Sequence, residues 1–210
     1  MSGELGFIHR FIPGTRLGAV PILLLHGTGG NENDLLELGR TIAPGAPLLS
    51  PRGRILENGM PRFFRRLAEG VFDIPDLKSQ AEQLARFIGD ARARYDLGDV
   101  APMALGLSNG ANIAAALLLL HPGILSAGLL FRPMVPLVPD HLPDLGGARV
   151  LIAAGLRDPI VPAADSQALG DLLRRAGAEV TLQWSNAGHG LVQADLAAAE
   201  RWMSTAAPAA

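Results

Sequence analysis

The clearest constraint on the fold is a set of short segments in which every residue is apolar, such as ILLL at 22–25 and VLIAA at 150–154. A strand with one face in solvent alternates apolar and polar residues, whereas a strand covered on both faces does not. We therefore expect a mostly parallel sheet that is buried on both sides. Its strands are expected within 7–12, 20–25, 48–50, 102–107, 127–131, 150–154 and 180–184.

Helical patterns separate these apolar segments. Over 76–95, apolar residues recur at steps of three and four, and the same spacing returns over 166–176 and 191–203. Residues 111–120 are almost wholly apolar but stop at His-Pro-Gly, well short of the roughly 20 residues that a membrane span needs, so we expect a buried helix there. Alternating strands and helices predict a three-layer α/β sandwich with helices on both faces of the sheet.

Composition narrows the class of protein. Of 210 residues, 49% are apolar and 18% charged, which predicts one compact domain over 1–210, with a frayed tail at 205–210, and excludes disorder. The net charge of −2 gives no attraction to nucleic acid or anionic membranes. Because there is no cysteine, disulfides and a cysteine nucleophile are excluded. The N-terminus does not resemble a signal peptide, so we expect a cytoplasmic protein. The sequence leaves open whether the protein forms a homodimer.

Two segments fit neither pattern, and segments this long in a compact domain often serve function. Residues 51–75 are rich in turns, and residues 132–147 hold four prolines. Neither segment is long enough for a separate lid domain, so we expect an open site. The arginines at 62, 65 and 66 are expected to form a basic patch on a solvated turn. The candidates for a substrate pocket, which could instead pack these segments onto the body, are Met60, Phe63, Phe64, Phe72, Met134, Val135 and Leu137.

The pentapeptide GLSNG at 106–110 lies where an apolar strand ends and the buried helix begins. In a Gly-x-Ser-x-Gly turn of this kind, the serine adopts a strained backbone and projects its hydroxyl above the sheet edge. Side chains two residues away would collide, which explains Gly106 and Gly110. We therefore expect Ser108 to be a nucleophile.

A serine hydroxyl needs an adjacent base, and histidine is the usual one. Of five histidines, His189 follows the last strand directly, in the loop NAGHG before the last helix. That loop lies at the carboxyl edge of the sheet, where a base facing Ser108 has to be. The other four have plainer roles as strand, loop or helix-end residues, and they are His9, His26, His121 and His141.

The base in turn needs a carboxylate that fixes its tautomer. Asp158 follows the strand at 150–154, again at the carboxyl edge. Asp165 competes with it, but its position beside Ser166 at a helix start suits an N-cap. We expect Asp158 to be the acid, and the chain order Ser, Asp, His is that of α/β-hydrolases.

Backbone donors for an oxyanion are expected in two loops. HGTGG at 26–30 follows a buried strand and precedes a helix, and its glycines let the backbone turn its N–H groups toward a substrate. We predict the donors to be the N–H groups of Thr28 and Asn109, with backbone path mattering more than side-chain identity. A P-loop is excluded because no Gly-Lys-Ser/Thr follows, and Glu32 breaks a dinucleotide-binding fingerprint. The histidines are too dispersed for a metal site.

Four stretches together make the chain resemble a known family. LHGTGGNENDLLEL at 25–38, GLSNGANIA at 106–114, GLRDPIVP at 155–162 and AGHGL at 187–191 resemble the bacterial phospholipase/carboxylesterase family of the α/β-hydrolase fold, which includes acyl-protein thioesterases and relatives of dienelactone hydrolase. The resemblance implies Ser108, Asp158 and His189 as the catalytic triad. It also implies hydrolysis of short-chain carboxylic esters without a cofactor.

The sequence departs from two branches of that family. Acyl-protein thioesterases usually have glutamine directly after the nucleophile, whereas this chain has Asn109 there. They also tend to have leucine at the position that Thr28 occupies in this chain. Dienelactone hydrolases use a cysteine nucleophile, which is absent here. A thioesterase, a lysophospholipase or a lactone hydrolase on the same triad remains an alternative, as does a binding protein that has kept the fold without turnover.

Overall fold

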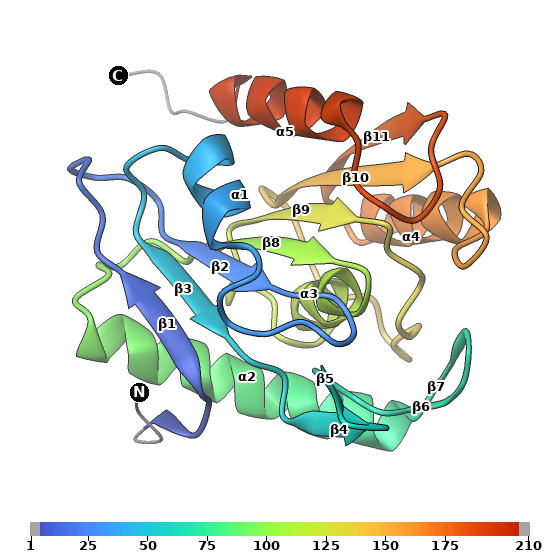
Figure 1. The fold of residues 1–210 in the computed structure, drawn as a ribbon, viewed down its shortest axis with the longest axis horizontal. Coiled ribbons are helices and arrows are strands. Elements are labelled where there is room, and N and C mark those ends of the chain that lie inside the picture. The colour runs from blue at the N-terminus through green and yellow to red at the C-terminus, as the bar shows by residue number, and fades with distance from the viewer. Residues whose placement is uncertain (1–4, 206–210) are drawn as a thin grey trace.

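Seven strands form one sheet in the computed structural model, which describes residues 5–205 (Figure 1). Their order across the sheet is β1-β3-β2-β8-β9-β10-β11, and only β1 runs antiparallel to its neighbour. The mostly parallel sheet predicted from the apolar segments is therefore confirmed. The strands are β1 (His9–Ile12), β2 (Ile22–Leu25), β3 (Leu48–Pro51), β8 (Met103–Leu107), β9 (Ala127–Phe131), β10 (Arg149–Gly155) and β11 (Glu179–Ser185).

The central strand β2 shows why the apolar segments do not alternate. Its side chains point alternately to the two faces, as in any strand. Leu23 and Leu25 belong to the core on one side of the sheet, and Ile22 and Leu24 to the core on the other. All four are buried, so neither face tolerates a polar residue.

Within the described residues 5–205, five helices cover the sheet (Figure 1). Their apolar residues divide into two clusters, with α2, α3 and α4 contributing to one face and α1 and α5 to the other, as a three-layer sandwich requires. The helices are α1 (Leu36–Ile42), α2 (Ile74–Arg94), α3 (Asn109–Leu120), α4 (Ala163–Arg175) and α5 (Gln193–Thr205). None of them, within residues 5–205, is long and apolar enough to cross a membrane.

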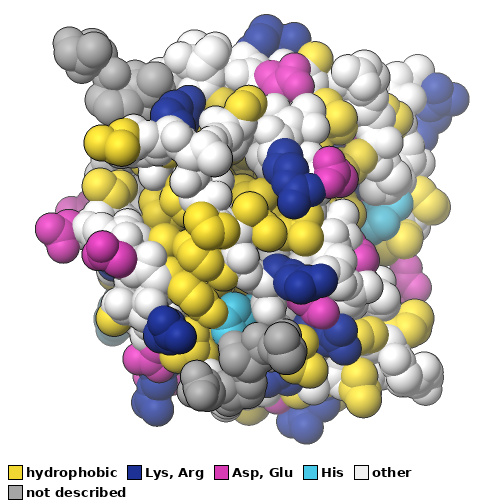
Figure 2. Space-filling model, turned by 60° about the vertical axis from the view of Figure 1, so that its left-hand side comes forward, with side chains coloured by type: hydrophobic (Ala, Val, Ile, Leu, Met, Phe, Trp, Pro, Cys, Tyr) yellow, Lys and Arg dark blue, Asp and Glu magenta, His cyan; other side chains and the backbone are white. Residues whose placement is uncertain are grey.

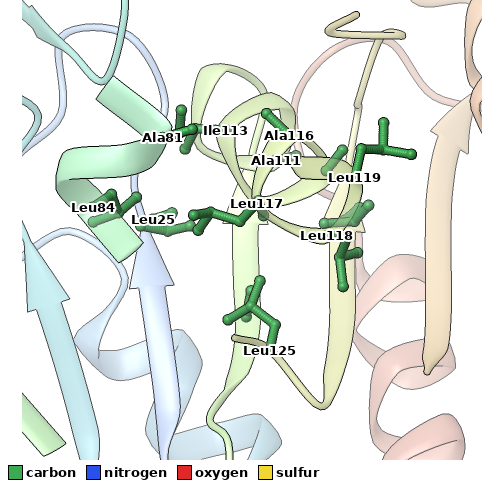
Figure 3. Close-up of a cluster of buried hydrophobic side chains, with 14 of the residues drawn as sticks. Leu25, Ala81, Leu84, Ala111, Ile113, Ala116, Leu117, Leu118, Leu119 and Leu125 are labelled. Atoms are coloured by element: carbon green, nitrogen blue, oxygen red, sulfur yellow. The ribbon is translucent and has the colours of Figure 1, made fainter. Parts of the chain in front are cut away.

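Helix α3 is the helix predicted to be buried. Every residue from Asn109 to Leu119 is buried, and the helix ends at His121, its C-cap. Figure 3 shows its side chains meeting α2 on one side, where Ala81 lies beside Ile113, and β2 beneath, where Leu25 approaches Leu117. A helix that is apolar all round needs this central position between the sheet and other helices.

The two irregular segments differ from one another. Residues 132–147 contain no helix or strand. The other segment contains two small antiparallel hairpins before Asp73 caps α2 by accepting the N–H of Asp76. The strands of these hairpins are β4 (Ile55–Glu57), β5 (Met60–Arg62), β6 (Arg66–Ala68) and β7 (Val71–Phe72).

One expectation for this segment was wrong. The side chain of Arg62 is only 4% exposed, so it is not part of a solvated basic patch, although Arg65 is exposed at 59%. The tail expected to fray at 205–210 lies, from 206 onward, outside the described residues.

Candidate active site

Ser108 occupies a sharp turn between β8 and α3. Its backbone has φ 51° and ψ −113°, a strained conformation that residues with a side chain rarely adopt. Both flanking glycines are required by close approaches. A Cβ on Gly106 would lie 2.6 Å from the Gly110 carbonyl oxygen, and one on Gly110 would lie 1.9 Å from the Leu25 oxygen. The turn is therefore pressed against β2, and the Ser108 hydroxyl is left at the sheet edge.

His189 and Asp158 reach the same place from separate loops. Asp158 follows β10 and His189 follows β11, so the parallel strands deliver both side chains to one edge of the sheet. The Nε2 atom of His189 lies 2.9 Å from Ser108 Oγ, and its Nδ1 lies 2.8 Å from Asp158 Oδ2. These distances make one continuous line of hydrogen bonds across three side chains that are 81 and 31 residues apart.

The charge state of Asp158 determines which atoms donate and which accept in these hydrogen bonds. Burial of its side chain raises the pKa, but N–H donation from Val161 and Ile160 and contact with His189 outweigh burial and lower the pKa below its ordinary value. An ionised carboxylate only accepts hydrogen bonds. His189 Nδ1 must then carry the proton, and Nε2 is free to accept the Ser108 hydroxyl.

Asp165, the competing acid, lies in the first turn of α4. The N-cap position predicted for it is occupied by Pro162, whose carbonyl accepts the Asp165 N–H. Pro162 has no N–H to satisfy and its fixed φ suits a helix start, so the helix begins without a side-chain cap.

The remaining histidines are engaged elsewhere. His9 bonds the Tyr95 hydroxyl at 2.7 Å, His121 caps α3 near Glu82, and His141 is exposed. Among residues 5–205, no three His, Cys, Asp or Glu side chains lie close enough together to hold a metal ion.

His26 is a buried structural residue of the first loop. Its Nε2 accepts the N–H of Gly53 at 2.9 Å, so its Nδ1 must donate, and the Gly27 carbonyl lies 2.7 Å from it. Burial lowers the pKa of His26 below 6.5, which keeps the ring neutral as these two bonds require. His26 thereby ties the loop after β2 to the segment after β3.

The residues of both predicted backbone donors line the same cavity as the serine. Thr28, Ser108 and Asn109 line one small cavity of about 40 Å³. Within residues 5–205, the N–H groups of Thr28 and Asn109 have no hydrogen-bond acceptor. Asn109 begins α3, where the helix dipole adds a partial positive charge.

Their side chains, however, are more engaged than the sequence suggested. Thr28 Oγ1 accepts a hydrogen bond from Arg62, and Asn109 Oδ1 accepts one from the Phe63 N–H. These two side-chain contacts were not expected from the sequence, and whether the backbone path matters more than side-chain identity at 28 and 109 stays a prediction.

The predicted pocket residues separate into two groups. Phe72 and Met134 line the cavity beside Ser108, together with Ile160 and Val161. Three others are buried in the core and do not line this cavity. The sequence could not separate them from pocket residues, because a large apolar side chain looks the same in either place. Those three are Phe63, Phe64 and Leu137, while Val135 packs against the same core and Met60 lies over Gly29.

A much larger cavity, of about 670 Å³, lies at the opposite edge of the sheet. It is lined at the strand starts by Ile22, Met103 and Ala127, and contains none of the triad residues. Figure 2 brings this face forward and shows a broad patch of hydrophobic side chains across its middle. Ser108, Asp158 and His189, which follow β8, β10 and β11, lie at the other edge.

Sequence reasoning did not identify two buried arginines near the site. Arg62 contacts Thr28, and Arg132 donates to the carbonyls of Gly188 and Gly190, which flank His189. The signal for Arg132 was an arginine placed directly after the buried strand β9, where a charge is unexpected. Its φ of 55° adds a strained backbone that no sequence pattern shows.

One curated protein and several solved structures resemble this chain. No protein-family model matches the chain. It is 47% identical over 185 residues to the Bacillus subtilis (strain 168) protein named "Putative hydrolase MhqD", covering 88% of this chain and 92% of that protein.

Two solved structures extend the comparison to the fold. The Bacillus cereus carboxylesterase is 46% identical with a TM-score of 0.92, covering 94% of this chain and 93% of that one. A carboxylesterase from Mesorhizobium loti is 36% identical with a TM-score of 0.90, covering 97% of each chain.

Proposed function

Since this chain belongs to the bacterial carboxylesterase family of the α/β-hydrolase fold and is a carboxylesterase-type hydrolase, we propose that it cleaves small carboxylic esters with Ser108, His189 and Asp158. The observation that carries the proposal is the unbroken hydrogen-bond line from Ser108 Oγ through His189 to Asp158. A serine, a base and an orienting acid in contact are what nucleophilic acyl transfer needs.

The proposed reaction has two stages. Ser108 Oγ attacks the ester carbonyl while its proton passes to His189 Nε2, and Asp158 stabilises the resulting imidazolium. The oxyanion of the tetrahedral intermediate accepts hydrogen bonds from the N–H groups of Thr28 and Asn109. His189 then gives its proton to the leaving alcohol, and an acyl group stays on Ser108.

In the second stage, water replaces the alcohol. His189 takes a proton from water as the water attacks the acyl-enzyme, and the same N–H groups stabilise the second intermediate. Collapse returns the proton to Ser108 and releases the carboxylic acid. Every proton is accounted for by Ser108, His189, the alcohol and water, so the proposal includes no cofactor.

The cavity beside Ser108 supports small substrates. Its volume is about 40 Å³, and its apolar wall of Phe72, Met134 and Val161 leaves room for a short acyl group. A long acyl chain would have to extend over the surface or displace this wall. We therefore propose acetyl and other short-chain esters as the preferred class.

A chain-length series tests the proposal. Turnover of p-nitrophenyl esters should be fastest for acetate and butyrate and should exceed that of acyl-CoA, lysophospholipid and aromatic lactones of equal concentration. Ser108→Ala should lower kcat by about 10⁴- to 10⁶-fold. A fluorophosphonate probe should label the native chain at Ser108 and leave the variant unlabelled.

Each rival function has its own result in this assay. Faster turnover of acyl-CoA, lysophospholipid or a lactone would assign the same triad to that reaction instead of small esters. Absence of both labelling and turnover in the folded native chain would indicate a binding protein. Full activity of Ser108→Ala would contradict the nucleophile itself.

A further inference from the structure

One short segment, residues 61–66, is hydrogen-bonded to both loops that carry the proposed oxyanion donors. The N–H of Gly29, next to Thr28, donates to the Pro61 carbonyl at 2.9 Å. Two residues further along the segment, the N–H of Phe63 donates to Asn109 Oδ1 at 2.7 Å. Because Thr28 follows β2 and Asn109 begins α3, the segment connects two residues that are 81 positions apart in the chain.

Arg62 strengthens this connection from the middle of the segment. Its Nη1 donates to Thr28 Oγ1 at 2.7 Å, and its Nε donates to the Phe64 carbonyl at 3.2 Å. Glu57 Oε2 lies 3.2 Å from the same Nε, and Glu57 is shared between Arg62 and Arg66. A guanidinium holds its N–H groups in one rigid plane, so these contacts restrict the position of Thr28 relative to the segment.

The Asn109 side chain is oriented by the same segment. Rotating its amide by a half-turn would set two N–H donors against each other, so the Phe63 N–H determines the orientation. In that orientation Asn109 Nδ2 is buried and has no hydrogen-bond partner within residues 5–205. A buried unpaired donor is unfavourable. It persists here because the bond to the Phe63 N–H holds the amide in place.

The surrounding arginines do not share this arrangement. Arg65 is exposed and pairs with Asp73 and Asp76 at the start of α2. Arg66 pairs with Glu57 through its Nε at 2.8 Å. Among Arg62, Arg65 and Arg66, Arg62 is the one whose guanidinium contacts Thr28.

We propose that Arg62 is a positioning residue for the oxyanion site, which it holds in shape through Thr28 while the adjacent Phe63 N–H holds Asn109. The proposal rests on the proposed function, because it concerns where two N–H donors meet the developing charge. Displacing one donor weakens binding of the tetrahedral intermediate more than binding of the flat ester. Loss of Arg62 should thus lower kcat and leave KM nearly unchanged.

Substitutions at both ends of the Arg62–Thr28 bond test this. Arg62→Met should lower kcat for p-nitrophenyl acetate by about 10- to 100-fold, below the loss expected for removing a donor outright, with KM within about threefold. Thr28→Val keeps the N–H and the side-chain shape but removes Oγ1, and should lower kcat similarly. Because both remove one contact, the double variant should be no worse than the poorer single variant. Arg62→Lys should recover part of kcat.

A trifluoromethyl ketone provides a readout independent of turnover. Ser108 Oγ adds to its carbonyl, the hydroxyl proton passes to His189, and the carbonyl oxygen becomes an oxyanion at the two N–H groups. The inhibition constant should rise in Arg62→Met by the same factor by which kcat/KM falls. The matched control is Arg65→Met, an arginine of the same segment on the surface, which should change neither quantity.

The outcomes separate this proposal from the proposed function. Native kcat and inhibition in Arg62→Met, with Ser108→Ala inactive, would overturn the role of Arg62 and leave the triad intact. A loss confined to KM, or losses that add in the double variant, would also overturn it. If Arg62→Met does not fold, Thr28→Val alone decides, because native kcat in that variant contradicts the proposal. Turnover by Ser108→Ala would remove the proposed function itself.

Discussion

The guanidinium of Arg132 and the carboxylate of Asp195 form an ion pair in which both side chains are 0% exposed. Arg132 stands just after β9, and Asp195 lies in the first turn of α5. The other N–H groups of Arg132 donate to the carbonyls of Gly188 and Gly190, each at 3.0 Å. Arg132, which is paired with Asp195, therefore holds the loop on either side of His189.

Arg132→Met should destabilise the protein and slow turnover together. Removing one member of a buried pair leaves Asp195 as an uncompensated charge, which costs about 3–5 kcal/mol of unfolding free energy. The loop around His189 loses two hydrogen bonds, and a displacement of the base lowers kcat by about 10- to 100-fold. Urea unfolding and kcat for p-nitrophenyl acetate measure the two effects.

Arg149→Met is the matched control for that experiment. Arg149 is 25% exposed and lies 3.6 Å from Glu179, far from the His189 loop along β10. Its partner Glu179 is 70% exposed, and a pair open to solvent contributes at most about 1 kcal/mol, so this variant should lose far less stability than Arg132→Met and no activity. Equal losses in the two variants would contradict the special position of Arg132.

Asp158→Asn should inactivate the enzyme while preserving its fold. The amide oxygen still accepts the N–H groups of Ile160 and Val161, but the amide no longer stabilises a positive charge on His189. By analogy with other triads, kcat should fall by about 10³- to 10⁴-fold. Asp165→Asn serves as control and should keep native kcat; a similar loss at Asp165 would reassign the acid.

Gly110→Ala should disrupt the serine turn, whereas Gly89→Ala should stabilise the protein. A Cβ at Gly110 would lie 1.9 Å from the Leu25 carbonyl oxygen, a backbone atom that cannot move aside, so we expect a loss of at least about 3 kcal/mol or failure to fold. A Cβ at Gly89, in α2, meets nothing within 4 Å, and alanine there should gain about 0.5–1 kcal/mol. Thermal unfolding of both variants checks the contrast, and tolerance of alanine at Gly110 would refute the packing argument.

The protein should lose stability as the pH falls below 6.5, in part because of His26. Burial holds its pKa below 6.5 in the folded state, so the unfolded state takes up the proton first. The contribution is complete above pH 6.5 and is lost as the pH falls toward the folded pKa, by about 1.4 kcal/mol for each unit between the two pKa values. Urea unfolding between pH 5 and 8 measures the slope.

His26→Asn should reduce that slope, because asparagine does not titrate yet can accept the Gly53 N–H. An identical slope in the native chain and in His26→Asn would show that another group controls acid stability.

The family motifs and the strands were readable from the sequence for a local reason. Whether a strand is covered on both faces depends on the hydrophobicity of its own residues, and Leu23 and Leu24 already record burial on opposite sides. The strained turn at Ser108 is likewise indicated by its neighbours, because the turn needs Gly106 and Gly110 within two residues of the serine. The pocket was read less well, because Phe63 and Phe64 look the same whether they face a ligand or the core.

The sequence by itself determined the seven strands of the main sheet, the turn that carries Ser108, and the loops on which Asp158 and His189 lie, because each depends on residues adjacent in the chain. Only the tertiary structure decided that Arg62 contacts Thr28 and that Arg132 pairs with Asp195. Those contacts join residues 34 and 63 positions apart, and no periodicity or turn rule encodes them. A buried charge is tolerable only where packing delivers its partner, so its place is settled when the chain folds as a whole.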